Sequence, residues 1–534
     1  MSKMGKKRNG WKVAFLALAA VVVVFLIWAF ISGDDYDDDY YDEPRKEGTQ
    51  LSDTVGGYTA DNNSQFLESD AVKEHKVNLV GGGNDTVTIL VYMNGSDLES
   101  EDSEATNDLT EMVNAGSSDK VNIIVQTMGT KKWNKKYGIS SSTAQRYKVD
   151  GSGLTLLEDN LGNLSCTESS TLRDFIRWGS SMFPADRYIL QFWNHGGGPV
   201  YGFGYDDKTE SEDYLGIDEI QKALGESGVY FDFIGMDCCL MSCMEVCCAF
   251  YDFCDYMILS EDFESGLGWE YTNWLSKLYE NTSISTRELG KIICDDMVNA
   301  NATNTDGWGD DSIMALVDMS MMKVLYQTWT DFAYSNEASL LDSNYSRKRT
   351  RSRNGRVHPA IAAASQPNSR GFFSSWFGDE DDEEDPLMSD YFVTDIMALA
   401  STISSTESKA LASAVNNTLV YVKACGEDTS LTGISVTLPY GDSDFYNSLK
   451  SVFKNCGFDD NYISWLGNFV SASGSNDYYD YDDWDDSWDG WDDYEDDFDW
   501  DEWCDECEYD DDYWDDDDSW GWLFYEFLED WIDY

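Results

Sequence analysis

Short apolar runs alternate with amphipathic stretches along most of the chain. The apolar runs are rich in β-branched and aromatic residues, which is typical of buried strands. In the stretches between them apolar residues recur every three or four positions, the spacing of one helix face. Strands alternating with helices predict an α/β fold with a mostly parallel sheet covered by helices on both faces. The predicted strands are residues 86–95, 121–129, 188–198, 231–237 and 312–318, with further strands expected within 256–271 and 432–441.

The predicted helices fill the intervals between these strands. In the first of them Leu109, Met112 and Val113 lie on one face. A helix is also expected from the end of the 312–318 strand to about residue 341, and two later stretches continue the helical periodicity. The other predicted helices are 98–115, 172–182, 217–224, 391–422 and 445–470.

The N-terminus carries a membrane-type pattern. Residues 13–31 are 19 positions without a charge, enough for a helix of about 28 Å across a hydrocarbon core of about 30 Å. Lys and Arg precede this run and acidic residues follow it, so the N-terminus is expected inside and the rest of the chain outside. We therefore predict a single-pass anchor in the cell membrane. A cleaved signal peptide is the alternative, although no small-x-small site follows the run.

The charge is strongly acidic and unevenly distributed. The chain has 36 Lys and Arg against 101 Asp and Glu, a net charge of −65. Residues 475–534 contain 29 acidic residues, interleaved with aromatic residues, and no Lys or Arg. This composition predicts a disordered, solvated tail, and the overall sign argues against nucleic acid as a partner. Residues 344–386 hold a basic cluster followed by an acidic run and are predicted to be an inserted loop.

Two chemically suggestive residues follow predicted strands. His195 comes at the end of 188–198 in the motif WNHGGG, and Cys239 follows 231–237 in MDCCLMSCMEV. In open α/β sheets, sites collect at the carboxyl ends of the strands. A thiol becomes a useful nucleophile when an imidazole is nearby to exchange protons with it. The two other histidines, His75 and His358, lie in the linker and in the inserted loop, so His195 is the candidate.

The motifs carrying these residues resemble the clostripain family of cysteine peptidases, in the caspase-like group. The resemblance runs through TILVYMNGSDLE, FWNHGGG, MDCCLMSCMEV, SEDFESGLGWEY and TGISVTLPYG, from about residue 86 to 470 without the insert. It implies a caspase-like sheet with His195 and Cys239 as the catalytic dyad. Backbone amides of Gly196 and Cys239 would hold the oxyanion. Cys238 stands where the family has Ala, and the register of the motif favours Cys239. No third catalytic carboxylate is expected.

The resemblance also implies the substrate. Family members prefer Arg or Lys before the cut, and Asp237 matches a pocket position two residues before the nucleophile. A second pocket acid comes from Glu261, Asp262 or Glu264, of which we select Glu264. A carboxylate facing a guanidinium makes a strong charge-assisted pair. The alternative for Asp237 is a cap on the following helix. Self-cleavage after the catalytic histidine is common in the family, and Lys208 is the expected site here.

These patterns predict seven regions in order. The peptidase domain is followed by the insert, and its C-terminal part forms an α/β extension before the tail. The regions are a basic cytoplasmic segment (1–12), the transmembrane helix (13–31), an acidic linker (32–84), the peptidase domain (85–343), the insert (344–386), the C-terminal part of the peptidase region (387–470) and the acidic-aromatic tail (471–534).

The cysteines and the acidic tail raise the question of cofactors. Six of the 12 Cys lie between residues 238 and 254. Cys243 and Cys247 share a helix face, and we expect buried thiols packing a helix against the sheet, with metal ligands or disulfides as the alternatives. No metal site is predicted and no cofactor is required, although some relatives depend on calcium.

The leading function is a membrane-anchored, outward-facing cysteine endopeptidase that acts on proteins or peptides containing Arg or Lys. Three other readings remain open on this scaffold. They are a catalytically silent surface binding or adhesion protein, a transpeptidase and an amidase.

Overall fold

The computed structural model describes residues 54–55, 58–59, 72–208, 214–303, 312–341, 393–426, 431–439 and 442–473, all within one compact unit, Met1–Asn476. The predicted anchor (13–31), most of the predicted linker, the insert (344–386) and nearly all of the acidic tail lie outside these residues. Within the described ranges, no helix combines the length and the apolar character needed to cross a bilayer.

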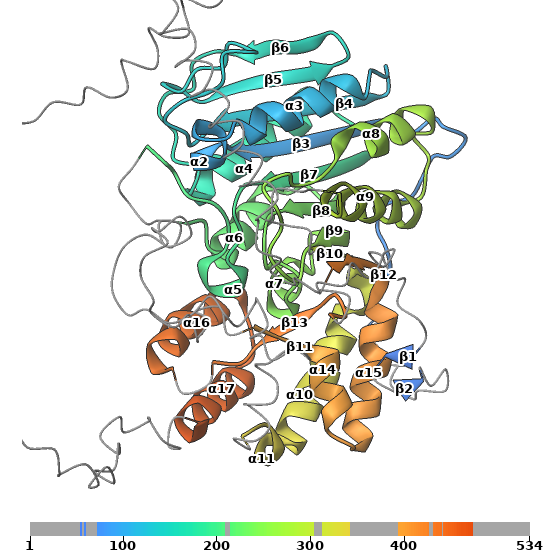
Figure 1. The fold of residues 1–534 in the computed structure, drawn as a ribbon, viewed down its shortest axis with the longest axis vertical. Coiled ribbons are helices and arrows are strands. Elements are labelled where there is room, and N and C mark those ends of the chain that lie inside the picture. Colours follow the sequence, from blue (N-terminus) through green and yellow to red (C-terminus); the bar gives the residue numbers. More distant parts are fainter. Residues whose placement is uncertain are drawn as a thin grey trace, which may run out of the picture. The chain divides into compact units, whose positions relative to one another are not determined.

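A nine-stranded sheet forms the centre of the fold, in the order β12-β10-β9-β8-β7-β3-β4-β5-β6 (Figure 1). The five strands from β4 to β9 across the middle are mutually parallel, and the strands at both edges are antiparallel to their neighbours. This confirms the prediction of a mostly parallel α/β sheet. The strands are β3 (Val87–Asn94), β4 (Val121–Met128), β5 (Gln145–Asp150), β6 (Gly153–Glu158), β7 (Arg187–Trp193), β8 (Phe231–Asp237), β9 (Cys254–Leu259), β10 (Ser312–Asp318) and β12 (Leu419–Cys425).

Helices cover both faces of the sheet (Figure 1). Alternate residues of β3 point to opposite faces, as the pleat requires. Leu90 and Tyr92 join the core packed by α4, α6, α7 and α10, and Ile89 and Val91 join the core packed by α3, α8 and α9. The helices are α2 (Ser96–Ser100), α3 (Glu104–Asn114), α4 (Ser169–Met182), α5 (Gly198–Tyr201), α6 (Ile217–Ser227), α7 (Met244–Phe250), α8 (Tyr271–Glu280), α9 (Thr286–Asn301), α10 (Met322–Ser335), α11 (Glu337–Leu340), α14 (Ile396–Thr402), α15 (Thr406–Thr418), α16 (Ser443–Cys456) and α17 (Asp460–Ser473), with a 3₁₀ turn at Met319–Met321.

The first helical stretch differs from its prediction. Residues 98–115 were expected as one helix, but α2 ends at Ser100 and α3 begins at Glu104. Between them Ser103 has a φ of 67°, a left-handed conformation that interrupts a right-handed helix. The Glu99 side chain accepts hydrogen bonds from the Thr106 N–H and hydroxyl (2.9 and 2.8 Å), so it fixes the break. The break leaves α2 as a short separate element directly after β3.

The region after the insert also departs from the helical prediction for 391–422. Residues 393–395 form a strand, β11 (Val393–Asp395), and the stretch from Leu419 onward is β12, an edge strand of the central sheet. The strand expected within 432–441 is only three residues long, β13 (Ser435–Thr437), and pairs with β11 rather than with the central sheet. A second small sheet is made by β1 (Thr54–Val55) and β2 (Tyr58–Thr59).

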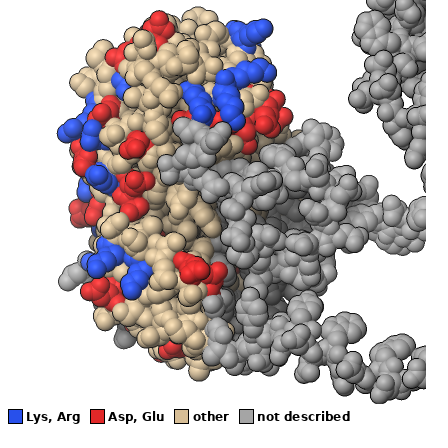
Figure 2. All heavy atoms as spheres, turned by 90° about the vertical axis from the view of Figure 1, so that its left-hand side faces the viewer, with Lys and Arg blue, Asp and Glu red and all other residues tan. Residues whose placement is uncertain are grey.

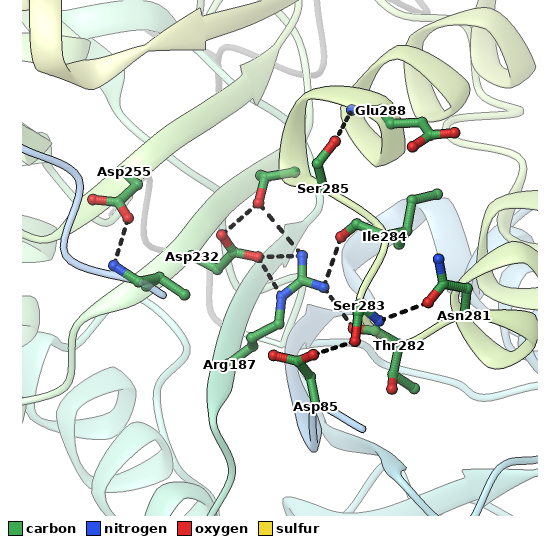
Figure 3. A network of polar contacts seen from close by, with 12 residues as sticks. Asp85, Arg187, Asp232, Asp255, Asn281, Thr282, Ser283, Ile284, Ser285 and Glu288 are labelled. Carbon is green, nitrogen blue, oxygen red and sulfur yellow. Dashed lines mark hydrogen bonds and ion pairs between the residues drawn. The ribbon is translucent and has the colours of Figure 1, made fainter. Parts of the chain in front are cut away.

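A buried ion pair fixes the edge of the sheet where the parallel strands begin (Figure 3). Arg187, at the start of β7, is fully buried and its Nη2 lies 2.6 Å from Oδ2 of Asp232 at the start of β8. Its Nη1 donates to the carbonyls of Thr282 and Ile284 (2.8 and 2.9 Å). The contacts of the guanidinium with Asp232, Thr282 and Ile284 are 2.6–2.9 Å long. They join β7 and β8 to the connection between α8 and α9.

The last residues of the predicted linker contact this same edge. Nε2 of His75 lies 2.8 Å from Oδ1 of Asp318, and the N–H groups of Lys76 and Val77 donate to the Asp255 carboxylate. The chain therefore enters the domain along the edge where β8 and β9 begin. On the face drawn in Figure 2, Lys and Arg are interspersed with Asp and Glu rather than segregated.

Candidate active site

His195 and Cys239 follow neighbouring parallel strands at the same edge of the sheet. Trp193, the last residue of β7, pairs with Asp237, the last residue of β8. His195 and Cys239 therefore each lie two residues beyond one rung of the ladder. Both are nearly buried, with 5% of each residue exposed. The prediction that the two residues meet at adjacent strand ends agrees with this register.

The backbones that carry the two residues are in close contact at Gly196. A Cβ placed on Gly196 would lie 2.1 Å from the carbonyl oxygen of Cys239 and 3.1 Å from its nitrogen. Only glycine fits there without moving the nucleophile segment. On the other side, Leu240 has a φ of 64° and its N–H donates to the Asp262 carbonyl (3.1 Å). A left-handed non-glycine residue is held only by its surroundings, and such strain concentrates at functional sites.

A carboxylate that was not predicted lies against the histidine. Oδ1 of Asp97, at the start of α2, is 2.9 Å from Nε2 of His195. Burial acts to raise the Asp97 pKa, but hydrogen bonds and the charge of His195 outweigh it and hold that pKa well below its usual range. The Ser96 hydroxyl also donates to Oδ1 (2.8 Å). The sequence-based expectation is of no third catalytic carboxylate, and the structure places the Asp97 carboxylate in contact with the imidazole.

The Cys239 sulfur lies against the loop that follows β9. The N–H of Glu264 points to Sγ at 3.2 Å. Burial and the nearby Glu264 carboxylate raise the pKa of the Cys239 thiol well above its ordinary value, so the thiol is protonated in this arrangement. Sequence reasoning left Glu261, Asp262 and Glu264 open for this loop, and it is Glu264 whose backbone contacts the sulfur.

The carboxylates of Asp237 and Glu264 are neighbours. The Asp237 carboxylate accepts hydrogen bonds from the Tyr271 hydroxyl (2.7 Å) and the Trp269 N–H (3.2 Å). Neither Glu264 oxygen makes a hydrogen bond of ordinary length and angle within the described part of the chain, although Asp237 and the Trp269 indole adjoin it. Burial is the largest cause of the raised pKa of both acids, and their mutual repulsion adds to the rise for Glu264.

The alternative role for Asp237, a cap on the following helix, does not fit these contacts. Helix α7 begins at Met244, and Cys243 before it makes no side-chain cap.

Two further acids have raised pKa values. Burial raises the pKa of Asp108, and it raises that of Glu111 to about 7. Such a group of buried carboxylates is costly unless a cation or shared protons neutralise it.

The neighbouring cysteines pack the core, as expected. Cys243 and Cys247 are fully buried and join α7 to the sheet, and Cys238 is 2% exposed within the same core. All ten cysteines in the described ranges are free thiols. Within the part of the chain that the structure describes, no group of three or more His, Cys, Asp or Glu side chains is placed to bind a metal ion.

Lys208, the expected self-cleavage site, is the last described residue of its segment. Its N–H donates to the Asp206 carboxylate (3.0 Å), and residues 209–213 lie outside the described residues. The same segment contains Tyr205, which sequence analysis missed. Its ring stacks on that of His195, with 5.9 Å between centroids.

The family is established by comparison with known proteins. A model of the clostripain family, peptidase C11, matches residues 91–531. Solved structures similar to this chain include a secreted C11 cysteine protease from Bacteroides thetaiotaomicron in complex with an irreversible peptide inhibitor (16% identity, 70% of this chain and 99% of that chain, TM-score 0.47). They also include an inactive zymogen C11 protease from Parabacteroides distasonis (17% identity, 70% and 97%, TM-score 0.49). No curated relative matches the chain. The family match covers most of the sequence, and the chain therefore belongs to the clostripain family and is a cysteine endopeptidase.

Proposed function

We propose that this peptidase cleaves after Arg or Lys, with Cys239 as the nucleophile and His195 as the acid–base group. The observation that carries the specificity is the Asp237–Glu264 pair. The Glu264 backbone contacts the Cys239 sulfur, while its carboxylate is buried without a well-formed hydrogen bond. A substrate guanidinium or ammonium placed between these acids would neutralise them and make charge-assisted hydrogen bonds.

The chemistry uses groups that the fold already brings together. The Cys239 sulfur attacks the scissile carbonyl carbon, and its proton passes to the imidazole. Because Nε2 of His195 is held by Asp97, the proton would pass through Nδ1 and then to the departing amine. Water then hydrolyses the thioester. The Gly196 and Cys239 amides are our candidates for the oxyanion site, where losing one donor costs about 2.7–4 kcal/mol of barrier.

A peptide series tests the specificity directly. Peptides identical except for Arg, Lys, citrulline or norleucine before the cut separate charge from shape, because citrulline is a neutral isostere of Arg. We expect kcat/KM for citrulline to fall by about 100-fold or more relative to Arg. Asp237→Asn and Glu264→Gln should reduce this ratio, and Glu288→Gln, at the far edge of the sheet (Figure 3), should preserve it. Equal cleavage of citrulline and Arg peptides would refute the proposal.

Self-processing after Lys208 is the second part of the proposed function. The support is the position of Lys208, 13 residues beyond His195 in a segment that is polar and basic only at this residue. Incubated wild-type protein should yield a new N-terminus at Thr209, and Cys239→Ala should remain intact. Full activity of a single-chain Lys208→Ala variant would show that this cut is not required.

The predicted membrane location is the third part of the proposed function. We propose a single-pass anchor at residues 13–31 with the catalytic domain outside, supported by the uncharged run and its flanking charges. Protease shaving of intact cells should remove the catalytic domain and spare the N-terminal segment.

The proposed mechanism requires no cofactor. Unchanged kcat in a chelator would exclude a calcium requirement, and loss of activity restored by calcium would establish one.

A further inference from the structure

Tyr205 is fixed against the catalytic histidine by both its ring and its backbone. The Tyr205 and His195 rings lie 26° from parallel, with 5.9 Å between centroids. The N–H of the preceding residue, Gly204, donates to the His195 carbonyl (2.9 Å). The histidine is thus contacted twice by a segment that follows it by ten residues.

The phenol of Tyr205 shares a carboxylate with the imidazole. The phenol helps to lower the pKa of Asp97, and the Asp97 charge helps to raise that of Tyr205, so the two groups interact closely. Burial and the Asp97 charge raise the Tyr205 pKa far above its ordinary value, so the hydroxyl keeps its proton and stays a donor. Asp97 therefore interacts with the Tyr205 phenol and also contacts Nε2 of His195, which lies 2.9 Å from its Oδ1.

The Tyr205 segment is itself anchored to the ends of two strands. Nδ2 of Asn94, the last residue of β3, donates to the Tyr205 carbonyl (2.8 Å). Two residues further on, the Asp207 N–H donates to the Gly129 carbonyl (3.0 Å), and the Asp207 carboxylate pairs with Lys131 (2.8 Å). These contacts fix Tyr205 from both sides of its position in the chain.

We propose that Tyr205 is a positioning residue for the catalytic imidazole: its phenol orients Asp97, and its ring and backbone hold His195 in the plane in which Asp97 meets Nε2. This inference rests on the proposed Cys239–His195 mechanism. A hydrogen bond to a charged group is among the stronger polar interactions in proteins, so losing the phenol should act through the Asp97–His195 pair. Binding of the substrate side chain takes place at Glu264 and should be unaffected.

The contacts of Asp207 would hold Tyr205 in place after self-cleavage. Asp207 lies between Tyr205 and the proposed cut after Lys208, and it is tied to Gly129 and Lys131. A break after Lys208 would therefore leave Tyr205 seated against His195. The catalytic residues would stay in register in the two-chain enzyme.

The test compares Tyr205→Phe with Tyr137→Phe in the full chain. Tyr137 is a matched control because its hydroxyl also donates a hydrogen bond, in this case to Thr110 (3.0 Å). Tyr137 and Thr110 both lie outside the candidate active site. Active centres are counted with a covalent thiol inhibitor, so that kcat refers to folded enzyme. We expect Tyr205→Phe to lower kcat about tenfold with KM within twofold, and Tyr137→Phe to match wild type.

A spectroscopic signature separates positioning from general stability. The proton between His195 Nε2 and Asp97 should give a low-field NMR signal that is lost in Asp97→Asn. This signal should shift or broaden in Tyr205→Phe and be unchanged in Tyr137→Phe. Tyr205→Phe with the kcat and signal of the control would overturn the proposal, as would a loss confined to the number of active centres. If His195→Ala keeps wild-type activity, the proposed dyad fails instead, and the two failures are distinct.

Discussion

Nε2 of His195 lies 2.9 Å from Oδ1 of Asp97, which comes from a different strand connection. Met93 of β3 pairs with Trp193 of β7, so Asp97 lies four residues and His195 two residues beyond one rung of the sheet. In the proposed mechanism, this carboxylate would orient the imidazole and stabilise positive charge on it after it takes the thiol proton. Asp97 would then act as a third group beside the proposed Cys239–His195 dyad.

Replacing Asp97 by Asn should impair the chemical step. The amide preserves the shape but removes the charge that faces the imidazole, so we expect kcat to fall about 10- to 100-fold with little change in KM. Steady-state kinetics on active-site-titrated enzyme measures this. Asp102→Asn, an exposed carboxylate five residues along the chain, is the control. Wild-type kcat in Asp97→Asn would show that the contact is only structural.

Glu264→Gln should change two rates in opposite directions. The Glu264 carboxylate helps to raise the pKa of the Cys239 thiol, so its removal should increase alkylation of Cys239 by neutral iodoacetamide several-fold, since one pKa unit is a tenfold change in thiolate. Cleavage of Arg peptides should fall, because the cation loses its partner. Mass spectrometry of the Cys239 peptide gives the first rate and peptide kinetics the second. A parallel fall in both rates would contradict this account of Glu264.

Arg187→Met should destabilise the fold strongly. It leaves Asp232 buried next to the Thr286 hydroxyl alone, and breaking a buried pair typically costs about 3–5 kcal/mol. Arg173→Met, which removes ion pairs with Asp174 and Glu226 on the surface, should hardly change stability, because solvent screens such pairs. Urea unfolding midpoints at equal protein concentration compare the two. Similar midpoints would mean that the network in Figure 3 is not a stability determinant.

The His75–Asp318 pair should make stability depend on pH. The hydrogen bond that the His75 imidazole donates to the Asp318 carboxylate raises the His75 pKa above its ordinary 6.5. The contribution of the pair is therefore complete just below pH 6.5 and disappears as the pH rises through the folded value. The Asp318 pKa is lowered from 3.8 despite burial, by its hydrogen bonds to His75 and Ser320, so the contribution is also lost in strong acid. His75→Gln should therefore cost about 1 kcal/mol or less near pH 5.5 and nothing at pH 9. A cost that is constant between these pH values would exclude the ion pair as its source.

The sequence was informative where one strong signal determines structure. The bounds predicted for the strands 231–237 and 312–318 agree with β8 and β10, because short, mostly apolar runs of this length are typical of buried strands. The sequence also predicts that His195 and Cys239 follow the ends of neighbouring parallel strands, and the register of β7 and β8 agrees with this placement. The resemblance leaves Glu261, Asp262 and Glu264 as candidates for the second pocket acid. Of the three we select Glu264, whose N–H points to the Cys239 sulfur.

Other features depend on contacts that leave no local pattern. Asp97 lies in SDLES and Tyr205 in GYDDK, and neither short stretch shows which histidine it faces. The break between α2 and α3 depends on Glu99 reaching Thr106, against a continuous helical pattern. Hairpin β5–β6 was missed because it mixes polar and apolar residues at an exposed edge. Residues 419–422 fall within the predicted helical stretch 391–422, but they belong to β12, because β10 offers an unpaired edge and tertiary pairing overrides the local preference.

We propose that Cys239, which follows the strand next to that of His195, attacks substrates bearing a cationic side chain. The decisive measurement is labelling with an Arg-directed covalent thiol probe, with the modified peptide mapped by mass spectrometry. We predict one adduct, on Cys239, that is absent in Cys239→Ala, strongly reduced in Glu264→Gln and retained in Cys238→Ala. An adduct on Cys238, or equal labelling by a citrulline probe, would contradict the account.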